Sequence, residues 1–222
     1  MWMLLAASLA WADAPPKPVV AMGDGLVAGP PASEALPVAG GWVPSLADCL
    51  EERAPGAFAV VDRAESGETA RSARKKVRDV VGLGPSTIVV TLGAQELADP
   101  DATTAALTGD LRALVDALHK RERPRVLLVG MVPPTLAQTD YADADRQQKA
   151  DARTTEWNAA VATLAGELPA VQHVDLWHDW PRDGERATLT QKGWSLSEQG
   201  HARVAAVVCD AVMAEPAAAS AP

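Results

Sequence analysis

The chain has 222 residues, of which 48% are hydrophobic and 22% charged, so it is long and apolar enough for one folded domain and is not wholly disordered. Its 20 Lys and Arg are outnumbered by 29 Asp and Glu, and the net charge of −9 argues against a nucleic-acid-binding protein. The two cysteines exclude a disulfide-rich scaffold and a four-cysteine zinc site. No apolar run reaches the roughly 18 residues that a membrane-spanning helix needs.

The two ends of the chain differ from the region between them. Residues 1–14 (MWMLLAASLAWADA) join a short apolar stretch to the cleavage pattern ADA, which indicates a secretory signal peptide cleaved after Ala14. Because no Lys or Arg precedes the apolar stretch, an uncleaved apolar segment is the alternative. Residues 215–222 (EPAAASAP) have no periodic pattern and are expected to be disordered. We therefore expect one domain over residues 15–214 in a secreted or periplasmic protein.

Five short apolar runs alternate with longer helical patterns along this domain. The runs are bounded by Gly, Pro or charged residues, as buried parallel strands are, and they lie at 18–22, 58–61, 87–92, 125–129 and 171–176. Helical spacing of apolar residues predicts helices at 42–53, 68–81, 103–120, 147–168 and 198–213. Five β-α units in series predict an α/β domain with a five-stranded parallel sheet and helices on both faces.

Ligands bind beyond the carboxyl ends of the strands in such a sheet, so the segments that follow the strands are the candidate site. The first strand leads into GDGLVAG at 23–29, and the second leads into AESGET at 64–69. The third leads into LGAQEL at 92–97, and the segment KGWSLSEQGH at 192–201 opens the last helix. In this order the four segments resemble the blocks GDSLxxG, AxSGxT, LGxNDL and DGxHLSxxGH of the SGNH (GDSL) hydrolases, close to small secreted thioesterases and arylesterases.

The resemblance implies a flavodoxin-like three-layer α/β/α fold with strand order 2-1-3-4-5. It also implies a Ser-His-Asp triad for ester hydrolysis, but the triad side chains are missing. The nucleophilic serine of the first block corresponds to Gly25, which has no hydroxyl to attack a carbonyl. The aspartate and histidine of the last block correspond to Lys192 and Ser195. His201 matches a second histidine of that block, which lies at the start of the last helix and outside the triad. We therefore expect no intact triad and no competent esterase.

Part of the oxyanion hole implied by the resemblance remains. In the family it combines a backbone N–H at position 25 with the second-block glycine and a third-block asparagine. Gly67 is retained, and Gln95 replaces the asparagine with an amide on a longer arm. Three further residues are expected to line the cleft, namely Asp24, Glu96 and Trp194. Because Lys192 is positive where the family has a negative side chain, we expect the cleft to prefer anionic ligands to neutral esters.

Three functions fit these residues. The first, which we favour, is a pseudo-enzyme that binds a glycan, an acyl ligand or a protein in the old cleft, with no cofactor. The second is an active esterase whose nucleophile is Ser66 or Ser195, with Lys192 as the base. The third is an interaction domain with a vestigial cleft, in which the basic run over 71–78 or the acidic surface meets a partner.

Cysteine, histidine and tryptophan residues outside the four blocks lead to three smaller expectations. Cys49 and Cys209 lie in the first and last helical segments, which cover the same face of a sheet of this order, and export favours a disulfide over two buried thiols. The spacing of His173, Asp175 and His178 suggests a metal, but no further ligand follows it, so we expect no metal site. The tryptophans after the fifth strand have two possible roles, packing over the sheet edge or contact with a ligand; they are Trp177, Trp180 and Trp194.

Overall fold

A computed structural model describes residues 15–24, 41–99, 101–135, 144–178, 180–181, 185–190 and 195–214. Its five parallel strands form one sheet in the order β2-β1-β3-β4-β5, as predicted. They are β1 (Lys17–Gly23), β2 (Phe58–Asp62), β3 (Thr87–Thr91), β4 (Arg125–Val129) and β5 (Val171–Val174). The last strand was predicted to reach Leu176, and it ends at Val174 because the side chain of Asp175 binds the backbone N–H groups of the next turn.

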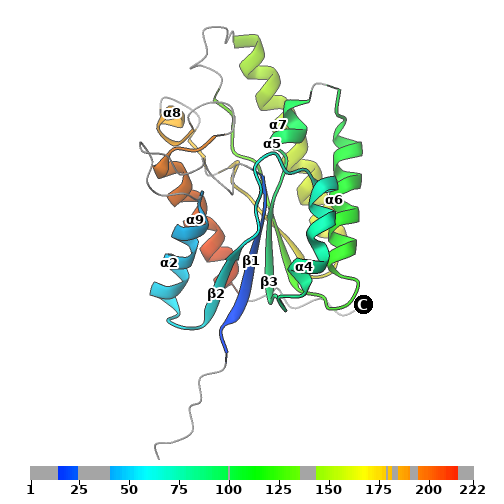
Figure 1. The fold of residues 1–222 in the computed structure, drawn as a ribbon. Coiled ribbons are helices and arrows are strands. Elements are labelled where there is room, and N and C mark those ends of the chain that lie inside the picture. Colours follow the sequence, from blue (N-terminus) through cyan, green and yellow to red (C-terminus); the bar gives the residue numbers. More distant parts are fainter. Residues whose placement is uncertain are drawn as a thin grey trace, which may run out of the picture.

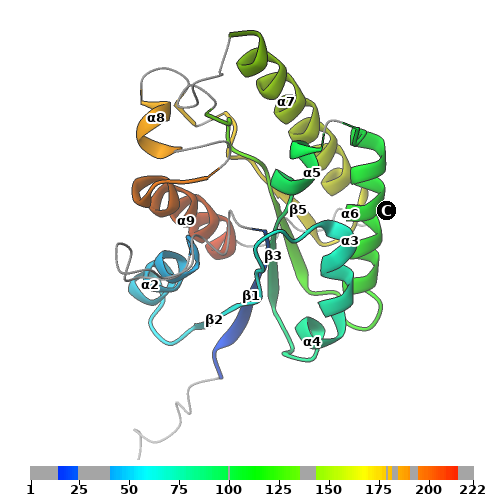
Figure 2. The same cartoon turned by 45° about the horizontal axis from the view of Figure 1, so that its top comes forward.

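Helices cover both faces of the sheet and give the three layers expected from the sequence (Figure 1). One face carries α2 (Val43–Arg53) and α9 (Glu198–Met213). The other carries α3 (Ala70–Ala73), η1 (Arg74–Lys76), α4 (Val77–Val81), α6 (Thr104–Leu118) and α7 (Ala144–Glu167) (Figure 2). Because both faces are covered, the central strands are apolar throughout, and Val19–Met22 and Ile88–Val90 are buried.

The helix predicted over 68–81 is three short helices instead. Thr69 and Ser72 form a capping box, in which each side chain binds the backbone N–H of the other, so the first helix begins at Ala70. Two more short helices, α5 (Ala94–Ala98) and α8 (Arg186–Leu189), were not predicted, because four or five residues are too few to establish a helical period.

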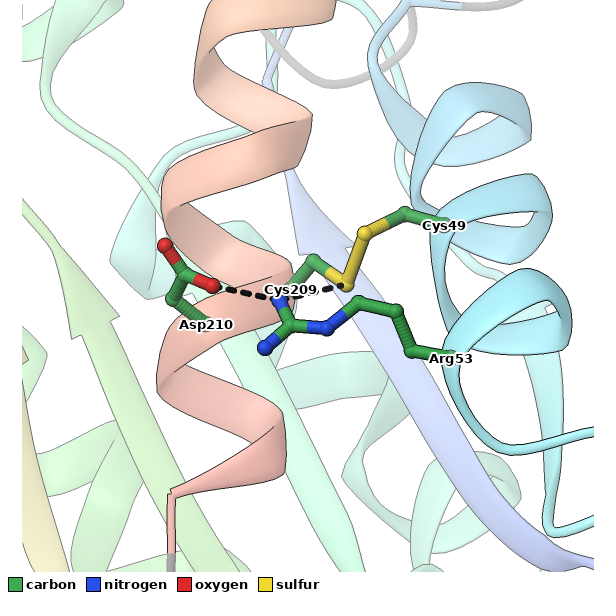
Figure 3. Close-up of a disulfide and its surroundings, with 4 residues drawn as sticks. All are labelled: Cys49, Arg53, Cys209 and Asp210. Atoms are coloured by element: carbon green, nitrogen blue, oxygen red, sulfur yellow. Dashed lines mark hydrogen bonds and ion pairs between the residues drawn. A yellow bond between two sulfur atoms is a disulfide. The ribbon is translucent and has the colours of Figure 1, made fainter.

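A disulfide joins the two helices of one face, as predicted (Figure 3). Cys49 of α2 and Cys209 of α9 have Cα atoms 6.4 Å apart and are 160 residues apart in the chain. The guanidinium of Arg53 lies 3.8 Å from the Cys209 sulfur and also forms an ion pair with Asp210. The bridge therefore links the first and the last helix of the described sheet domain.

The predicted signal peptide (1–14) and the predicted tail (215–222) lie outside the described residues. Within the described ranges, none of the helices combines the length and the apolar character that crossing a bilayer would require.

Candidate active-site cleft

The candidate site lies where parallel strands end side by side at the carboxyl edge of the sheet. Five of the residues expected there are described, namely Asp24, Gly67, Gln95, Glu96 and Ser195. Gly25, Lys192 and Trp194 lie outside the described residues. Asp24, Gly67, Gln95 and Glu96 come from the connections after β1, β2 and β3, which meet because these strands are neighbours in the sheet. Ser195 comes from a fourth connection, between β5 and α9.

Asp24 holds the end of β1 against the start of α5. Its backbone N–H donates to the Thr91 carbonyl at 3.2 Å, and its carboxylate accepts the Ala94 N–H at 3.0 Å. The residue is fully buried. A carboxylate in this position satisfies a helix-start N–H that would otherwise be unpaired in the interior. Asp24 therefore fixes the geometry of the residues that follow β1 and β3.

Gly93 permits a close contact between the turn after β3 and α7. Its φ is +141°, and a Cβ at this position would lie 2.7 Å from Trp157 Nε1 and 3.0 Å from Met131 Cγ. Both neighbours are buried side chains. A larger residue would displace the turn that carries Gln95 and Glu96, so this glycine is required by space as well as by backbone conformation.

Gln95 and Glu96 are adjacent in α5 and have opposite environments. Glu96 is buried, and its Oε1 accepts the Ala70 N–H at 2.9 Å, which ties α5 to the start of α3. Its Oε2 has no hydrogen-bond partner among the described residues, and burial raises the pKa of this carboxyl. Gln95 is exposed, so its amide is accessible at the cleft edge.

The second block forms a turn whose glycine is in a left-handed conformation. Gly67 has φ of +81° and is exposed, whereas the next residue, Glu68, is buried. Burial raises the pKa of Glu68, and its 2.6 Å ion pair with Lys76 acts in the opposite direction. A pocket of about 280 Å³ opens beside this turn, with Ser66 and Lys75 in its lining.

The connection after β4 is held by Asn158, which the sequence did not single out. Its Oδ1 accepts the Met131 N–H at 2.7 Å, and its Nδ2 donates to the Met131 carbonyl at 2.8 Å. Asn158 is buried in α7. Gly130 packs against it so closely that a Cβ on residue 130 would lie 3.1 Å from Asn158 Oδ1. Nothing in the local sequence distinguishes this asparagine from a solvent-exposed one, because its partner is 27 residues away.

The histidine-containing segment after β5 forms a turn. Asp175 Oδ1 accepts the Trp177 N–H at 2.7 Å and the His178 N–H at 3.2 Å, and Oδ2 pairs with the His178 ring. Burial raises the pKa of Asp175, but these hydrogen bonds outweigh burial and leave it lowered. Among the described residues, no three His, Cys, Asp or Glu side chains are grouped so as to hold a metal ion. Trp177 and Trp180 are buried, which supports packing as their role.

The last block leads into α9. Ser195 is exposed, and the Ser197 hydroxyl caps the helix by accepting the Gly200 N–H at 3.1 Å. His201 lies in the first turn, as expected, and burial lowers its pKa to about 4, so its ring is neutral at pH 7. Its Nδ1 has no hydrogen-bond partner within the described ranges. These features suit a structural histidine better than a catalytic base.

The strand order and the described loops after β1, β2 and β3 at one edge of the sheet define an SGNH-type α/β hydrolase fold. Residues 21–203 match the model of the GDSL-like lipase/acylhydrolase family, and the chain belongs to that family. A search of curated proteins found no match.

Solved structures of esterases and acylhydrolases share the fold. A lipase/acylhydrolase from Enterococcus faecalis has 20% identity and a TM-score of 0.66, with 88% of this chain and 95% of that chain covered. A carbohydrate esterase family 3 protein from Talaromyces cellulolyticus has 14% identity and a TM-score of 0.67, with 89% and 96% covered. An acetyl xylan esterase has 16% identity and a TM-score of 0.67, with 88% and 100% covered. At these identities the likeness concerns the fold alone.

Proposed function

We propose that this protein is an exported pseudo-enzyme of the GDSL-like family that binds a glycan or an acyl ligand in the cleft at the strand ends. One observation carries the proposal: the triad positions are occupied by Gly25, Lys192 and Ser195, so nucleophile, orienting carboxylate and base are all missing. In a serine protease, removing the whole triad lowers kcat about 10⁶-fold, or roughly 8 kcal/mol of barrier. What remains of an oxyanion hole does not compensate a loss of that size.

The surroundings of the proposed cleft support a change of chemistry on a maintained scaffold. Buried contacts that position its loops are present, such as those of Asp24 with Ala94 and of Glu96 Oε1 with Ala70, while Glu96 Oε2 has no partner among the described residues. Drift of an unused fold would be expected to disrupt such buried polar pairs first, because each unpaired group costs about 1–3 kcal/mol. The scaffold therefore fits a site that still needs a defined shape.

The proposed ligand is anionic. Lys192 supplies a positive charge at a position where the family has an aspartate. The neighbouring carboxylates of Asp24 and Glu96 are buried and bind backbone N–H groups, so they are not exposed to repel an anion. Binding of an anionic ligand is expected to weaken with Lys192→Ala, and binding unaffected by that change would contradict the assignment.

Export is supported by the apolar leader over 1–14 and by the Cys49–Cys209 disulfide, since disulfides persist in oxidising compartments.

One observation favours the rival proposal of an active carboxylic ester hydrolase. Ser66 is exposed and lines a pocket together with Lys75, so a hydroxyl and an amine share one space. A lysine can serve as the base for a serine when its amine is neutral. A serine-directed fluorophosphonate separates the two proposals, because labelling that disappears in Ser66→Ala would establish the esterase.

The main test measures hydrolysis of short-chain p-nitrophenyl esters by the native chain and by the triple variant Gly25→Ser/Lys192→Asp/Ser195→His. The matched control is the double variant Lys192→Asp/Ser195→His, which has the aspartate and the histidine of the triad but no nucleophile at position 25. We expect a silent native chain, a silent double variant and turnover by the triple variant. Hydrolysis by the native chain that depends on Ser66 or Ser195 would refute the proposal.

A further inference from the structure

The groove between α4 and α6 lies at the edge of the sheet opposite the cleft. The turns after these helices, at 82–86 and 119–124, lead into the amino ends of β3 and β4 (Figure 2). The cleft lies at the carboxyl ends of the strands, so the two features are separated by the length of the sheet. The groove has a volume of about 550 Å³, within the range of small-molecule sites.

The lining of this groove is apolar below and cationic at its rim. Four apolar side chains line it, namely Val77, Val81, Ala117 and Leu118. Three of these four remain partly accessible, so apolar surface is open to solvent here. Three exposed cations, Arg78, Lys120 and Arg121, also line the groove, together with one exposed carboxylate, Glu122. An apolar floor with charges along its edge matches a ligand that has an alkyl part and a charged end.

The positive charge at this edge is exceptional within an acidic chain. Segments 70–81 and 119–125 hold nine of the 20 Lys and Arg and only two of the 29 Asp and Glu. Four of these cations lie at or beside the groove, are exposed and form no ion pair with any described residue, namely Arg78, Lys120, Arg121 and Arg123. Lys75 instead lines the pocket beside Gly67.

Nearby negative charge does not cancel these cations. Exposed carboxylates in and beside the two segments are Asp79, Asp116 and Glu122. The carboxyl ends of two helices add about half a negative charge each. Within the lining itself three cations, Arg78, Lys120 and Arg121, face one carboxylate, Glu122, so the groove is net positive and selects for an anion.

We propose that the α4–α6 groove binds a single-chain amphiphile with an anionic head group, the alkyl chain lying on Val77, Val81 and Ala117 and the head group meeting Arg78, Lys120 and Arg121. Fatty-acid carboxylates and lysophospholipids have this chemistry. A nucleic acid would leave the apolar floor without a partner. A purely acidic peptide would also leave the apolar floor without a partner.

The test is isothermal titration calorimetry of the mature chain with decanoate below its micelle concentration. Butyrate shares the head group without the chain, and decyl maltoside shares the chain without the charge, and we expect both to bind at least about 5-fold more weakly. Arg121→Glu is expected to weaken decanoate binding by more than about 5-fold. Lys149→Glu makes the same charge change on exposed α7 and is expected to have no effect. Ala117→Phe is expected to reduce binding by filling the groove.

Two further arms distinguish this site from other possibilities. Decanoate bound in the groove is expected to be the component that Arg121→Glu removes and that Lys192→Ala leaves in place. Decanoate bound in the proposed cleft would instead be the component that Lys192→Ala removes. Equal effects of Arg121→Glu and Lys149→Glu would overturn the proposal. So would binding only to phosphatidylcholine–phosphatidylglycerol vesicles, which indicates a membrane surface, or tighter binding of polyglutamate, which indicates an acidic protein.

Discussion

Removing the Cys49–Cys209 disulfide is expected to lower the free energy of unfolding by about 5 kcal/mol. The bridge spans 160 residues of sequence, and the loop-entropy relation gives about 5 kcal/mol at 25 °C for a closed loop of this length. The native contacts between α2 and α9 do not depend on the bridge alone, because Val43, Leu46 and Leu50 of α2 are buried in the same core as α9. We therefore expect Cys49→Ala/Cys209→Ala to fold and to be less stable.

Urea unfolding followed by tryptophan fluorescence measures this loss. With a slope of about 2–3 kcal/mol per molar urea, the midpoint is expected to fall by roughly 2 M. A phosphine reductant is expected to lower the midpoint of the native chain and to leave the double variant unchanged, which controls for other effects of the reductant. A loss below about 1 kcal/mol in both the variant and the reduced chain would refute the loop-entropy argument.

Three more substitutions, with one control, test the buried residues around the site. Gly93→Ala is expected to destabilise by about 1–3 kcal/mol, because its Cβ would lie 2.7 Å from Trp157 Nε1. Gly109→Ala, in open space on α6, is expected to stabilise by about 0.5–1 kcal/mol. Urea titrations in which Gly93→Ala is more stable than Gly109→Ala would contradict both expectations. Burial raises the pKa of Glu96, so the ionised carboxylate lowers the stability of the fold as the pH rises above the pKa of the unfolded chain. In thermal melts, Glu96→Gln should therefore raise the melting temperature at pH 7 and leave it unchanged near pH 4. Burial lowers the pKa of His201 to about 4, so the unfolded chain binds a proton at a higher pH than the folded chain does. The free energy of unfolding should fall by up to about 3 kcal/mol between pH 6.5 and 4, and His201→Gln should reduce this pH dependence.

The sheet could be predicted from the sequence because its strands are short, β1 to β4 are largely apolar, and Gly, Pro or charged residues bound them. The strand order followed from the resemblance to the SGNH hydrolases. The Cys49–Cys209 pairing followed from that order, which places the first and last helices on one face of the sheet, and from the expected export. The candidate loops were located by the rule that ligands bind beyond the carboxyl ends of parallel strands. The structure places four of the candidate residues in the connections that follow β1, β2 and β3, namely Asp24, Gly67, Gln95 and Glu96.

The remaining features depend on contacts between distant residues. Asn158 binds Met131 from the middle of a 24-residue helix, where its own neighbours give no signal. Space around Gly93 is limited by Trp157, which is 64 positions further on and packs there only in the folded chain. Two segments some 40 residues apart likewise build the α4–α6 groove, so a basic run read along one helix indicated only half of it.

The bridge between α2 and α9 also decides what a protease can release. A single backbone cut between Cys49 and Cys209 leaves both fragments attached to each other through the sulfur atoms. A nicked molecule would run as one band on a non-reducing gel and as two after reduction. Separation of the fragments therefore requires two independent events, cleavage and reduction, and an oxidising environment that contains proteases supplies only the first.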